Sequence, residues 1–413
     1  MLLEGVRTLD SFNPSGKKVL LRVDINSPVD RKTGRIESDT KINAATLTLN
    51  QLLRRGASAV LLAHQGRPGD YDFISLRQHW NILRKRVEGE IDFVPDTCGE
   101  EAVDRISGLR PGQALLLENV RYLDYEQKKG TAEEHARTEL VTRLSPLFDY
   151  FVNDAFAAVH RAHCSMVGFT GRLPSAAGRL MESELSHLSP LLDRPERPVV
   201  YLFGGRKFAD FLPVLRAVAA REDVDHILLS GYLAISFLMA SGTKADDATG
   251  EEIRKEADDA FFEEARKLIS GGGKIALPVD MGFSVSGRRA DMEVSGWPAG
   301  ARALDIGPST IEHFSEVIAG ARTVFISGPP GVYEKEEFSS GTRRLFEAAC
   351  GSGIYSVIGG GHTSSAARQL GFEGKVSYVS TGGGALEALI TGKELPVLKY
   401  LKESGRKFSG SFT

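Results

Sequence analysis

Three residues that can carry positive charge stand close together in the segment NDAFAAVHRAH, residues 153–163. His160, Arg161 and His163 follow the apolar run YFV, which reads as the end of a buried strand. Arginine offers a planar fork of donors that suits carboxylate and phosphate oxygens, and histidine adds a donor without a permanent charge. One such segment alone could be a solvated basic loop. The choice depends on whether other strand ends carry groups of the same kind.

Four apolar runs in the first half of the chain, at 19–26, 59–66, 114–121 and 150–156, end in such groups. The residues within or just after these ends are Arg22, Asp24, Asn26, His64, Arg67, Arg121, His160 and Arg161. In open parallel sheets, ligands bind outside the carboxyl ends of the strands. Because four strand ends each carry an arginine, we expect a pocket for a small polyanion bearing carboxylate, hydroxyl and phosphate groups.

Strand ends in the second half of the chain are rich in glycine instead. They carry Gly204, Gly205, Gly328, Gly331, Gly359–Gly361 and Gly382–Gly384. Glycine lets the backbone approach a ligand closely, and the N–H groups at a helix N-terminus bind phosphate. Two GGG segments precede helix-like segments, which favours a phosphate cradle over simple turns. Lys207, just after a Gly-Gly pair, either meets a phosphoryl group or is an ordinary surface lysine. Neither a Walker A sequence nor a dinucleotide-binding fingerprint is present.

The elements that position these ends are short runs of Val, Ile and Leu separated by helical stretches. Continuous apolar runs indicate parallel strands buried on both faces, so the expected class is α/β and doubly wound. A chain of 413 residues exceeds what one hydrophobic core usually supports, which favours two domains.

The change from charged to glycine-rich strand ends falls near residues 180–198. There Met181, Leu185, Leu188 and Leu192 form a helical stripe, and the sequence DRPERP follows. We interpret this as an interdomain helix and linker; an ordinary surface helix inside one large domain is the alternative. The predicted divisions are an N-terminal domain 1–178, the helix and linker 179–198, a C-terminal domain 199–390 and a tail 391–413.

Composition narrows the classes of protein. The chain has 51 Lys and Arg against 54 Asp and Glu, a net charge of -3, which argues against non-specific nucleic-acid binding. Its three cysteines are far apart, which argues against a disulfide framework and suits a reducing cytoplasm. No signal peptide or membrane span is expected. We therefore expect a cytoplasmic protein with small-molecule partners.

Taken together, these segments resemble phosphoglycerate kinases. The matching stretches run in order from about residue 17 to 397 and include LLRVDINSPVD, AHQGRP, LLLENVRY, VNDAFAAVHRAH, FGGRKFAD, DIGPSTIEHF, SGPPGVYEKEEFSSGT, VIGGGHT and STGGGALEALITGKELP. RVDINSPVD and GGGHT look closest to the archaeal branch. The resemblance implies two doubly wound, Rossmann-like parallel-sheet domains joined by a helix, with the C-terminal tail returning to the N-terminal domain and packing there.

The activity that the resemblance implies is reversible phosphoryl transfer from 1,3-bisphosphoglycerate to Mg-ADP, giving 3-phosphoglycerate and ATP. The first domain would bind 3-phosphoglycerate through Arg22, Asp24, Asn26, Lys41, His64, Arg67, Arg121, His160 and Arg161. The second would bind nucleotide through Gly205, Arg206, Lys207, Gly328, Glu334, Gly359, Gly360, Gly361, His362 and Thr363, with Glu334 on the ribose hydroxyls. The catalytic set would be Lys207, Lys41, Gly361 and Gly384. Mg²⁺ is the implied cofactor; its protein ligands, and the choice between monomer and homodimer, stay open.

Several residues depart from the family pattern. Lys41 stands where an arginine is usual, which keeps the charge and loses two-pronged hydrogen bonding. Arg206 and Phe211 occupy the positions of an alanine and a second lysine, and we hypothesise that Arg206 supplies the missing charge. His362 replaces an aspartate, and Ser327 replaces an asparagine or similar residue.

Because of these departures, three other functions stay open. One is a kinase of the same fold that acts on a different acyl phosphate. Another is a weak paralogue that binds nucleotide or a partner protein. The third is a two-domain NAD-dependent dehydrogenase, which fits the architecture but lacks the fingerprint. In a phosphoglycerate kinase the leaving carboxylate needs no general base, so the histidines are expected to bind rather than shuttle protons. Substrates on separate domains would require closure, with the helix at 180–193 as hinge.

Overall fold

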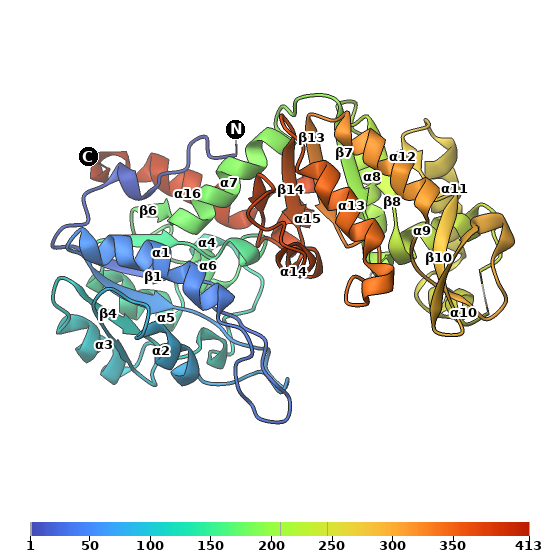
Figure 1. Cartoon of the computed structure of the whole chain (residues 1–413). Coiled ribbons are helices and arrows are strands. Elements are labelled where there is room, and N and C mark those ends of the chain that lie inside the picture. Colours follow the sequence, from blue (N-terminus) through green and yellow to red (C-terminus); the bar gives the residue numbers. More distant parts are fainter. Residues whose placement is uncertain (1, 207, 246, 413) are drawn as a thin grey trace. The chain divides into compact units, whose positions relative to one another are not determined.

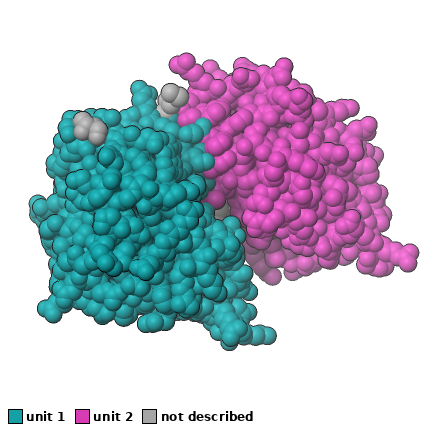
Figure 2. Space-filling model, turned by 60° about the vertical axis from the view of Figure 1, so that its left-hand side comes forward, with its two compact units in different colours: residues 1–186, 394–413 teal, residues 187–393 magenta. Residues whose placement is uncertain are grey.

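The computed structural model describes residues 2–206, 208–245 and 247–412, and the chain divides into two compact units (Figures 1 and 2). Unit 1 consists of Met1–Ser186 with Glu394–Thr413, and unit 2 of His187–Lys393. Each contains a six-stranded parallel sheet. The predicted α/β class, with two doubly wound parallel sheets and a returning C-terminal segment, is confirmed.

The sheet of unit 1 has the strand order β3-β4-β2-β1-β5-β6. Its strands are β1 Lys18–Arg22, β2 Ser58–Leu62, β3 Glu90–Phe93, β4 Gln113–Leu116, β5 Tyr150–Asn153 and β6 Ser175–Ala177. Arg22 pairs with Leu62 of β2 and with Asn153 of β5, and Leu61 pairs with Leu116 of β4. The four strands that carry the charged ends are therefore consecutive, and their carboxyl ends lie at one edge of the sheet.

Both faces of this sheet are covered, because successive side chains of each strand point to opposite sides. Val19 and Leu21 of β1 pack in a cluster with α1, whereas Leu20 packs in a second cluster with α3 and α5. The helices of unit 1 are α1 Thr40–Arg54, α2 Arg77–Leu83, α3 Glu100–Ser107, α4 Ala132–His135, α5 Glu139–Leu144, α6 Cys164–Val167 and α16 Pro396–Lys407. This burial on both faces explains why the strands read as continuous apolar runs.

Helix α7, Arg179–Leu192, carries the chain from unit 1 to unit 2. Met181, Leu185 and Leu188 of the predicted stripe are fully buried, whereas its last member, Leu192, is half-buried and Leu191 is buried instead. The first turn is anchored to unit 1, because Thr48 Oγ1 accepts from the backbone N of Arg179 at 2.8 Å and Asp154 Oδ1 accepts from that of Met181 at 3.0 Å.

The C-terminal segment packs against β6 and α6 of unit 1, where α16 is drawn in red in Figure 1. Ser404 Oγ donates to the carbonyl of Leu173 at 3.1 Å, and Tyr150 donates through its hydroxyl to the carbonyl of Ser411 at 3.1 Å. The ring of Phe412 lies 6.5 Å from Phe12 and 6.4 Å from Tyr150. Residues from both ends of the chain thus share one cluster.

The parallel sheet of unit 2 has the order β15-β14-β13-β7-β8-β9. Its strands are β7 Val199–Phe203, β8 His226–Leu229, β9 Ile275–Ala276, β13 Thr323–Ser327, β14 Tyr355–Gly359 and β15 Tyr378–Val379. Its helices are α8 Leu212–Ala219, α9 Gly231–Ala240, α10 Asp247–Glu256, α11 Asp259–Ser270, α12 Pro308–Ala319, α13 Ser340–Ala349, α14 Gly361–Gln369 and α15 Gly384–Ile390.

Unit 2 also contains a small antiparallel sheet that the sequence pattern does not predict. It has the order β11-β10-β12, formed by β10 Asp280–Val285, β11 Arg288–Glu293 and β12 Arg302–Ile306. Asp305 of β12 is fully buried and accepts from the backbone N of Gly341, at the start of α13, at 2.9 Å. Arg289 of β11 donates to the same carboxylate at 2.8 Å. The small sheet therefore supports the N-terminus of α13.

Candidate substrate and nucleotide sites

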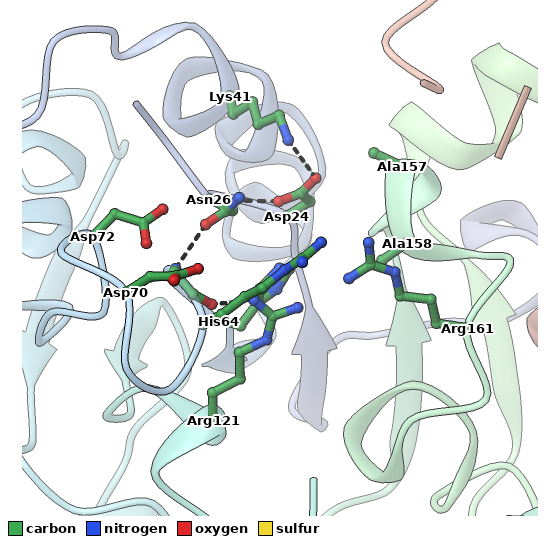
Figure 3. Close-up of a pocket in the computed structure, with 12 residues that line it drawn as sticks. Asp24, Asn26, Lys41, His64, Asp70, Asp72, Arg121, Ala157, Ala158 and Arg161 are labelled. Carbon is green, nitrogen blue, oxygen red and sulfur yellow. Dashed lines mark hydrogen bonds and ion pairs between the residues drawn. The ribbon is translucent and has the colours of Figure 1, made fainter. Parts of the chain in front are cut away.

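The ends of β1, β2, β4 and β5, together with α1, line a cavity of about 170 Å³ (Figure 3). The lining residues are Asp24, Asn26, Lys41, His64, Gly66, Arg67, Asp70, Asp72, Arg121, Ala157, Ala158 and Arg161. All of the predicted substrate-binding residues except Arg22 and His160 are among them. The structure thus gathers side chains that are far apart in the sequence into one cation-rich site.

Asp24 and Lys41 form the upper wall of the cavity in Figure 3. Asp24 is 7% exposed, and its Oδ2 accepts from Lys41 Nζ at 2.8 Å while its Oδ1 accepts from the backbone N of Asn26 at 3.0 Å. Burial raises the pKa of Asp24, but the Lys41 ammonium and these hydrogen bonds outweigh burial and lower the pKa to about 2. Asp24 is therefore an ionised acceptor, suited to a hydroxyl group, and Lys41 has further donors for a ligand.

Arg22 lies behind the cavity wall rather than in it, and is 1% exposed. Its Nη1 donates to the carbonyl of Val23, and its Nη2 lies 2.9 Å from His64 Nδ1. Arginine has no acceptor, so Nδ1 accepts this hydrogen bond and the proton of neutral His64 sits on Nε2. Burial and the nearby charge of Arg22 hold the pKa of His64 well below its ordinary value. His64 is therefore a neutral donor.

Arg121 and Arg161 bring two more cations to the cavity. Arg121 is anchored through Nη1 to the carbonyl of Gly66, and Arg161 Nε donates to His160 Nε2 at 3.2 Å. Burial, and then the charges of Arg161 and Arg22, lower the pKa of Arg121 to about 10. The positive charges of these neighbouring arginines repel one another, and an anionic ligand would relieve that repulsion. His160 contributes by holding Arg161.

In unit 2 the glycine-rich strand ends are joined by backbone hydrogen bonds. The N–H groups of Gly204 and Gly205 donate to the carbonyls of Ser327 and Pro329, at 2.9 and 3.1 Å. The N–H of Gly328 donates to Thr363 Oγ1, in the first turn of α14, at 2.7 Å. A Cβ at position 328 would lie 2.0 Å from the carbonyl oxygen of Gly204, so only glycine fits there. The loops of β7, β13 and β14 therefore form one surface.

Helices α14 and α15 begin at Gly361 and Gly384, so both present N-terminal N–H groups. Gly359 ends β14, and Gly360 has a φ of +92°, which an L side chain rarely adopts. His362 and Glu334 are exposed. Exposed helix N-termini of this kind can bind phosphate, and the phosphate cradle that the glycine pattern predicts stays a prediction.

Arg206 is 71% exposed and lies 3.7 Å from the carboxylate of Glu252. Glu252 already accepts hydrogen bonds from Arg302 and Tyr232, each at 2.7 Å. The negative charge of Glu252 is therefore only partly available to Arg206. Phe211 packs edge-on against Phe203, with ring centroids 5.5 Å apart. Lys207 lies outside the described residues.

Neither a protein-built metal cluster nor a membrane-spanning helix is found in the described chain. Within residues 2–206, 208–245 and 247–412, no group of three or more His, Cys, Asp or Glu side chains is placed to hold a metal ion. No helix in this described part combines the length and apolar character needed to cross a membrane.

Sequence reasoning missed the supports of the cavity. Gly66, Asp70, Asp72, Ala157 and Ala158 complete the lining, and Asn26 Oδ1 accepts from the backbone N of Gly66 at 2.9 Å. Behind the wall, Glu126 and Ser165 contact each other, and Ser165 contacts Arg22. Their positions, five residues after Arg121 and two after His163, are a signal only once the strand order is known.

Two parallel-sheet units, one with a cation-lined cavity and the other with glycine-rich strand ends at helix N-termini, are the arrangement expected of an α/β phosphotransferase. The family model described as "Phosphoglycerate kinase" matches residues 9–393. The chain therefore belongs to the phosphoglycerate kinase family, and the predicted family and kinase class are confirmed.

Two similar proteins and one solved structure carry the same family name. The chain is 40% identical to the phosphoglycerate kinase of Methanothermus fervidus over 97% of this chain and 98% of that one. It is 42% identical to that of Methanothermobacter thermautotrophicus over 96% and 97%. The crystal structure of phosphoglycerate kinase from Pyrococcus horikoshii OT3 matches with a TM-score of 0.89 and 35% identity, covering 97% of this chain and 100% of that chain. These archaeal relatives agree with the predicted archaeal resemblance.

Proposed function

We propose that this chain transfers a phosphoryl group reversibly between 1,3-bisphosphoglycerate and Mg-ADP, giving 3-phosphoglycerate and ATP. The observation that carries the proposal is the cavity of unit 1, where the cations Lys41, Arg67, Arg121 and Arg161 share the lining with the carboxylates of Asp24, Asp70 and Asp72. A three-carbon acid with carboxylate, hydroxyl and phosphate groups matches that arrangement of charge.

Each group of 3-phosphoglycerate has a proposed partner. Asp24 and Asn26 hold the hydroxyl, because a buried ionised carboxylate beside an amide can accept from it and donate to it. Arg67, Arg121 and Arg161 hold the phosphate, whose three oxygens can each accept charge-assisted hydrogen bonds. Lys41 faces the reacting carboxyl end, and Arg22 and His160 support His64 and Arg161 from behind.

The nucleotide is proposed to bind the glycine surface of unit 2. Gly205, Gly328, Gly359–Gly361 and Thr363 would cradle the phosphates, Glu334 would hold the ribose hydroxyls, and Arg206, Lys207 and His362 would face the phosphate end. Mg²⁺ usually keeps several waters and binds through substrate phosphates rather than through an all-protein cage. We therefore treat Mg²⁺ as arriving with ATP or ADP.

Phosphoryl transfer depends mainly on placing the two substrates in line and on neutralising the charge of the transferring group. The side chains of Lys41 and Lys207 and the N–H groups at Gly361 and Gly384 would neutralise the transferring phosphoryl group. The leaving carboxylate is a weak base, so no residue needs to remove a proton. The low pKa of His64 suits this mechanism, because a neutral histidine can donate to the substrate without titrating near neutral pH.

The decisive experiment is a coupled assay with 3-phosphoglycerate, ATP and Mg²⁺, in which added glyceraldehyde-3-phosphate dehydrogenase oxidises NADH. Robust turnover supports the proposal. Binding of 3-phosphoglycerate and ATP without turnover would indicate a weak paralogue. Turnover only with another carboxylate would indicate a kinase that acts on a different acyl phosphate.

A variant locates the substrate in the cavity. Arg161→Ala is expected to raise the KM for 3-phosphoglycerate about tenfold and leave the KM for ATP unchanged, because it removes a charged hydrogen-bond donor from the cavity. Arg172→Ala is the control, since Arg172 is an exposed arginine of the same unit that donates to the carbonyl of Ala136. Equal effects of the two variants would contradict the assignment.

A cytoplasmic location is part of the proposal, supported by free Cys98, Cys164 and Cys350, which suit a reducing compartment. Analytical sedimentation of the purified chain would decide between a monomer and a homodimer.

A further inference from the structure

A buried carboxylate lies beneath the cavity without lining it. Glu126 is 1% exposed, and both of its oxygens are occupied by Ser165: Oε1 accepts from Ser165 Oγ at 2.6 Å and Oε2 from Ser165 N at 2.8 Å. The backbone carbonyl of Glu126 accepts from the N–H of Cys164 at 3.0 Å. Glu126 therefore has no direct contact with a ligand in the cavity, yet its position is fixed at both main chain and side chain.

The neighbour that accounts for this carboxylate is Arg22. A buried guanidinium needs an opposite charge, because taking an isolated charge out of water is costly. Asp24, which also attracts Arg22, is already paired with Lys41 at 2.8 Å. Glu126 provides the second negative charge, and Ser165 bridges the two, since its Oγ lies 2.9 Å from Arg22 Nε. Burial raises the pKa of Glu126, and the charge of Arg22 opposes that rise.

These contacts form a hydrogen-bond chain with one direction. Arginine only donates, so the Ser165 oxygen accepts from Arg22 Nε and the Ser165 hydroxyl is left to donate to Glu126. Arg22 Nη2 then donates to His64 Nδ1 at 2.9 Å. Because Arg22 can only donate, His64 Nδ1 accepts and the proton of His64 is left on Nε2. Ser165 and Glu126 fix the place of the guanidinium that makes this contact. His64, unlike the other members of the chain, lines the cavity.

We propose that Glu126 is a positioning residue, which acts through Ser165 and Arg22 to hold His64 in the Nε2-protonated tautomer, ready to donate to the substrate. The kinetic consequence rests on the proposed function, whereas the tautomer itself does not.

The test uses the full chain with Glu126→Gln and Ser165→Ala. A glutamine amide whose oxygen keeps the bond from Ser165 N turns its NH₂ group to Ser165 Oγ and removes the charge that faces Arg22. The guanidinium is then no longer held beside His64 Nδ1. Glu118→Gln is the matched control. Glu118 is also buried, at 6% exposed, and accepts from Ser75 Oγ at 2.6 Å and from Leu76 N at 2.9 Å. Ser75 Oγ accepts in turn from the backbone N of Arg77 rather than from a guanidinium. Ser165→Ala leaves the carboxylate in place and breaks only the bridge.

Two readouts separate positioning from general loss of stability. Nitrogen-15 NMR of the histidine rings reports the tautomer of His64, with its signals assigned by their loss in His64→Gln. We expect the Nε2-protonated form in wild type and in Glu118→Gln, and a mixture of tautomers in Glu126→Gln and Ser165→Ala. The KM for 3-phosphoglycerate should rise about tenfold in those two variants, the cost of one misplaced donor, while the KM for ATP stays unchanged.

A His64 that keeps the Nε2-protonated form in both variants would overturn the inference. So would a KM for 3-phosphoglycerate that rises equally in the control. If Glu126→Gln does not fold, Ser165→Ala decides alone. If wild type turns over no 3-phosphoglycerate, the proposed function fails, and the NMR comparison still decides whether Glu126 sets the tautomer.

Discussion

Lys41 illustrates how a single substitution keeps charge while changing geometry. Its ammonium pairs with Asp24 at 2.8 Å, and its side chain is 37% exposed, so a ligand entering the cavity can reach it. A lysine makes a point-like charge contact, whereas the arginine usual at this position offers a two-pronged one. Proximity to Asp24 means that removing Lys41 affects both stability and catalysis.

Replacing Lys41 with methionine is expected to lower the unfolding free energy at pH 7 by about 2 kcal/mol. The folded pKa of Asp24, about 2, is below its ordinary value, so the stabilisation is present above pH 4 and lost as pH falls through 2. Denaturant titrations at pH 7, 4 and 2 should therefore show wild type approaching the variant on acidification. We also expect a fall in kcat of roughly 10²-fold.

Lys17→Met serves as the control, because Lys17 pairs with Asp149 at 3.2 Å on the surface and both side chains are well exposed. A surface pair contributes little. Equal losses of stability in the two variants at pH 7 would show that the buried pair has no special role.

Arg206 tests the second departure from the family. Because Glu252 shares its charge with Arg302 and Tyr232, Arg206 can leave it for a nucleotide phosphate at small cost. Arg206→Ala is expected to raise the KM for ADP several-fold. Arg216→Ala, an exposed arginine paired with Glu264 in the same unit, is the control. An unchanged KM for ADP would end the hypothesis.

The sequence predicts the members of the cavity better than their orientation. Charged residues at the ends of four neighbouring strands could be recognised, because parallel strands bring their carboxyl ends to one edge. The burial of Arg22 could not, because the side of the sheet on which a strand's last side chain lies depends on the pleat. Glu126 stands in the charged stretch YEQKKG, where a lone glutamate reads as a solvated residue.

At the scale of elements, the start of α7 contains a buried titratable group. Asp154 is 1% exposed and accepts from the backbone N of Met181, and Gly178 is so close that a Cβ there would lie 2.4 Å from the carboxylate. Burial raises the pKa of Asp154 to about 6, although hydrogen bonds from Thr48 and Met181 oppose it. The helix that joins the two units therefore begins at a carboxyl group that titrates near neutral pH.

Asp154→Asn should remove this pH dependence. The native state holds a proton up to about pH 6, whereas the unfolded chain releases it near its ordinary pKa, so stability falls as pH rises between these values. The variant cannot ionise and is expected to exceed wild type at pH 8 by on the order of 2 kcal/mol and to match it near pH 4. Thermal unfolding at both pH values measures this.

The control for that experiment is Asp96→Asn. Asp96 accepts from the backbone N of Cys98, Gly99 and Ala102 at the start of α3 and is only half-buried. We expect the Asp96→Asn variant to be less stable than wild type at pH 8. An Asp154→Asn variant that is also less stable than wild type at pH 8 would show that the buried carboxylate stabilises the fold, the opposite of the expected sign.

Elements that the sequence did not predict lack a continuous apolar run. Strand β3, EIDF, lies at the edge of its sheet and alternates exposed residues with the buried Ile91 and the half-buried Phe93, and β6 consists of the small residues SAA. Strand β11, RRADME, is mostly exposed. Hydrophobic pattern marks strands that contain an apolar run, so the central parallel strands and the short edge strands β9 and β15 were predicted. Strands β3 and β6 and the small antiparallel sheet were not.

At the scale of the whole molecule, substrate and nucleotide are proposed to bind different units. Phosphoryl transfer requires the reacting atoms within about 3–3.5 Å of each other, so the ternary complex must bring the two sites together. Small-angle scattering should show a smaller radius of gyration with 3-phosphoglycerate and ATP together than with either alone. An unchanged radius in the ternary complex, at saturating concentrations, would count against closure.

The return of residues 394–413 to unit 1 also sets an order of assembly on the ribosome. Residues 187–393 are synthesised before α16, so unit 2 has its whole sequence before unit 1 does. Unit 1 cannot form the contacts of Ser404 with Leu173 and of Phe412 with Phe12 until these last residues are made. We therefore expect unit 1, which contains the N-terminus, to complete its fold after unit 2. This is the reverse of the usual order, in which N-terminal domains fold first during synthesis.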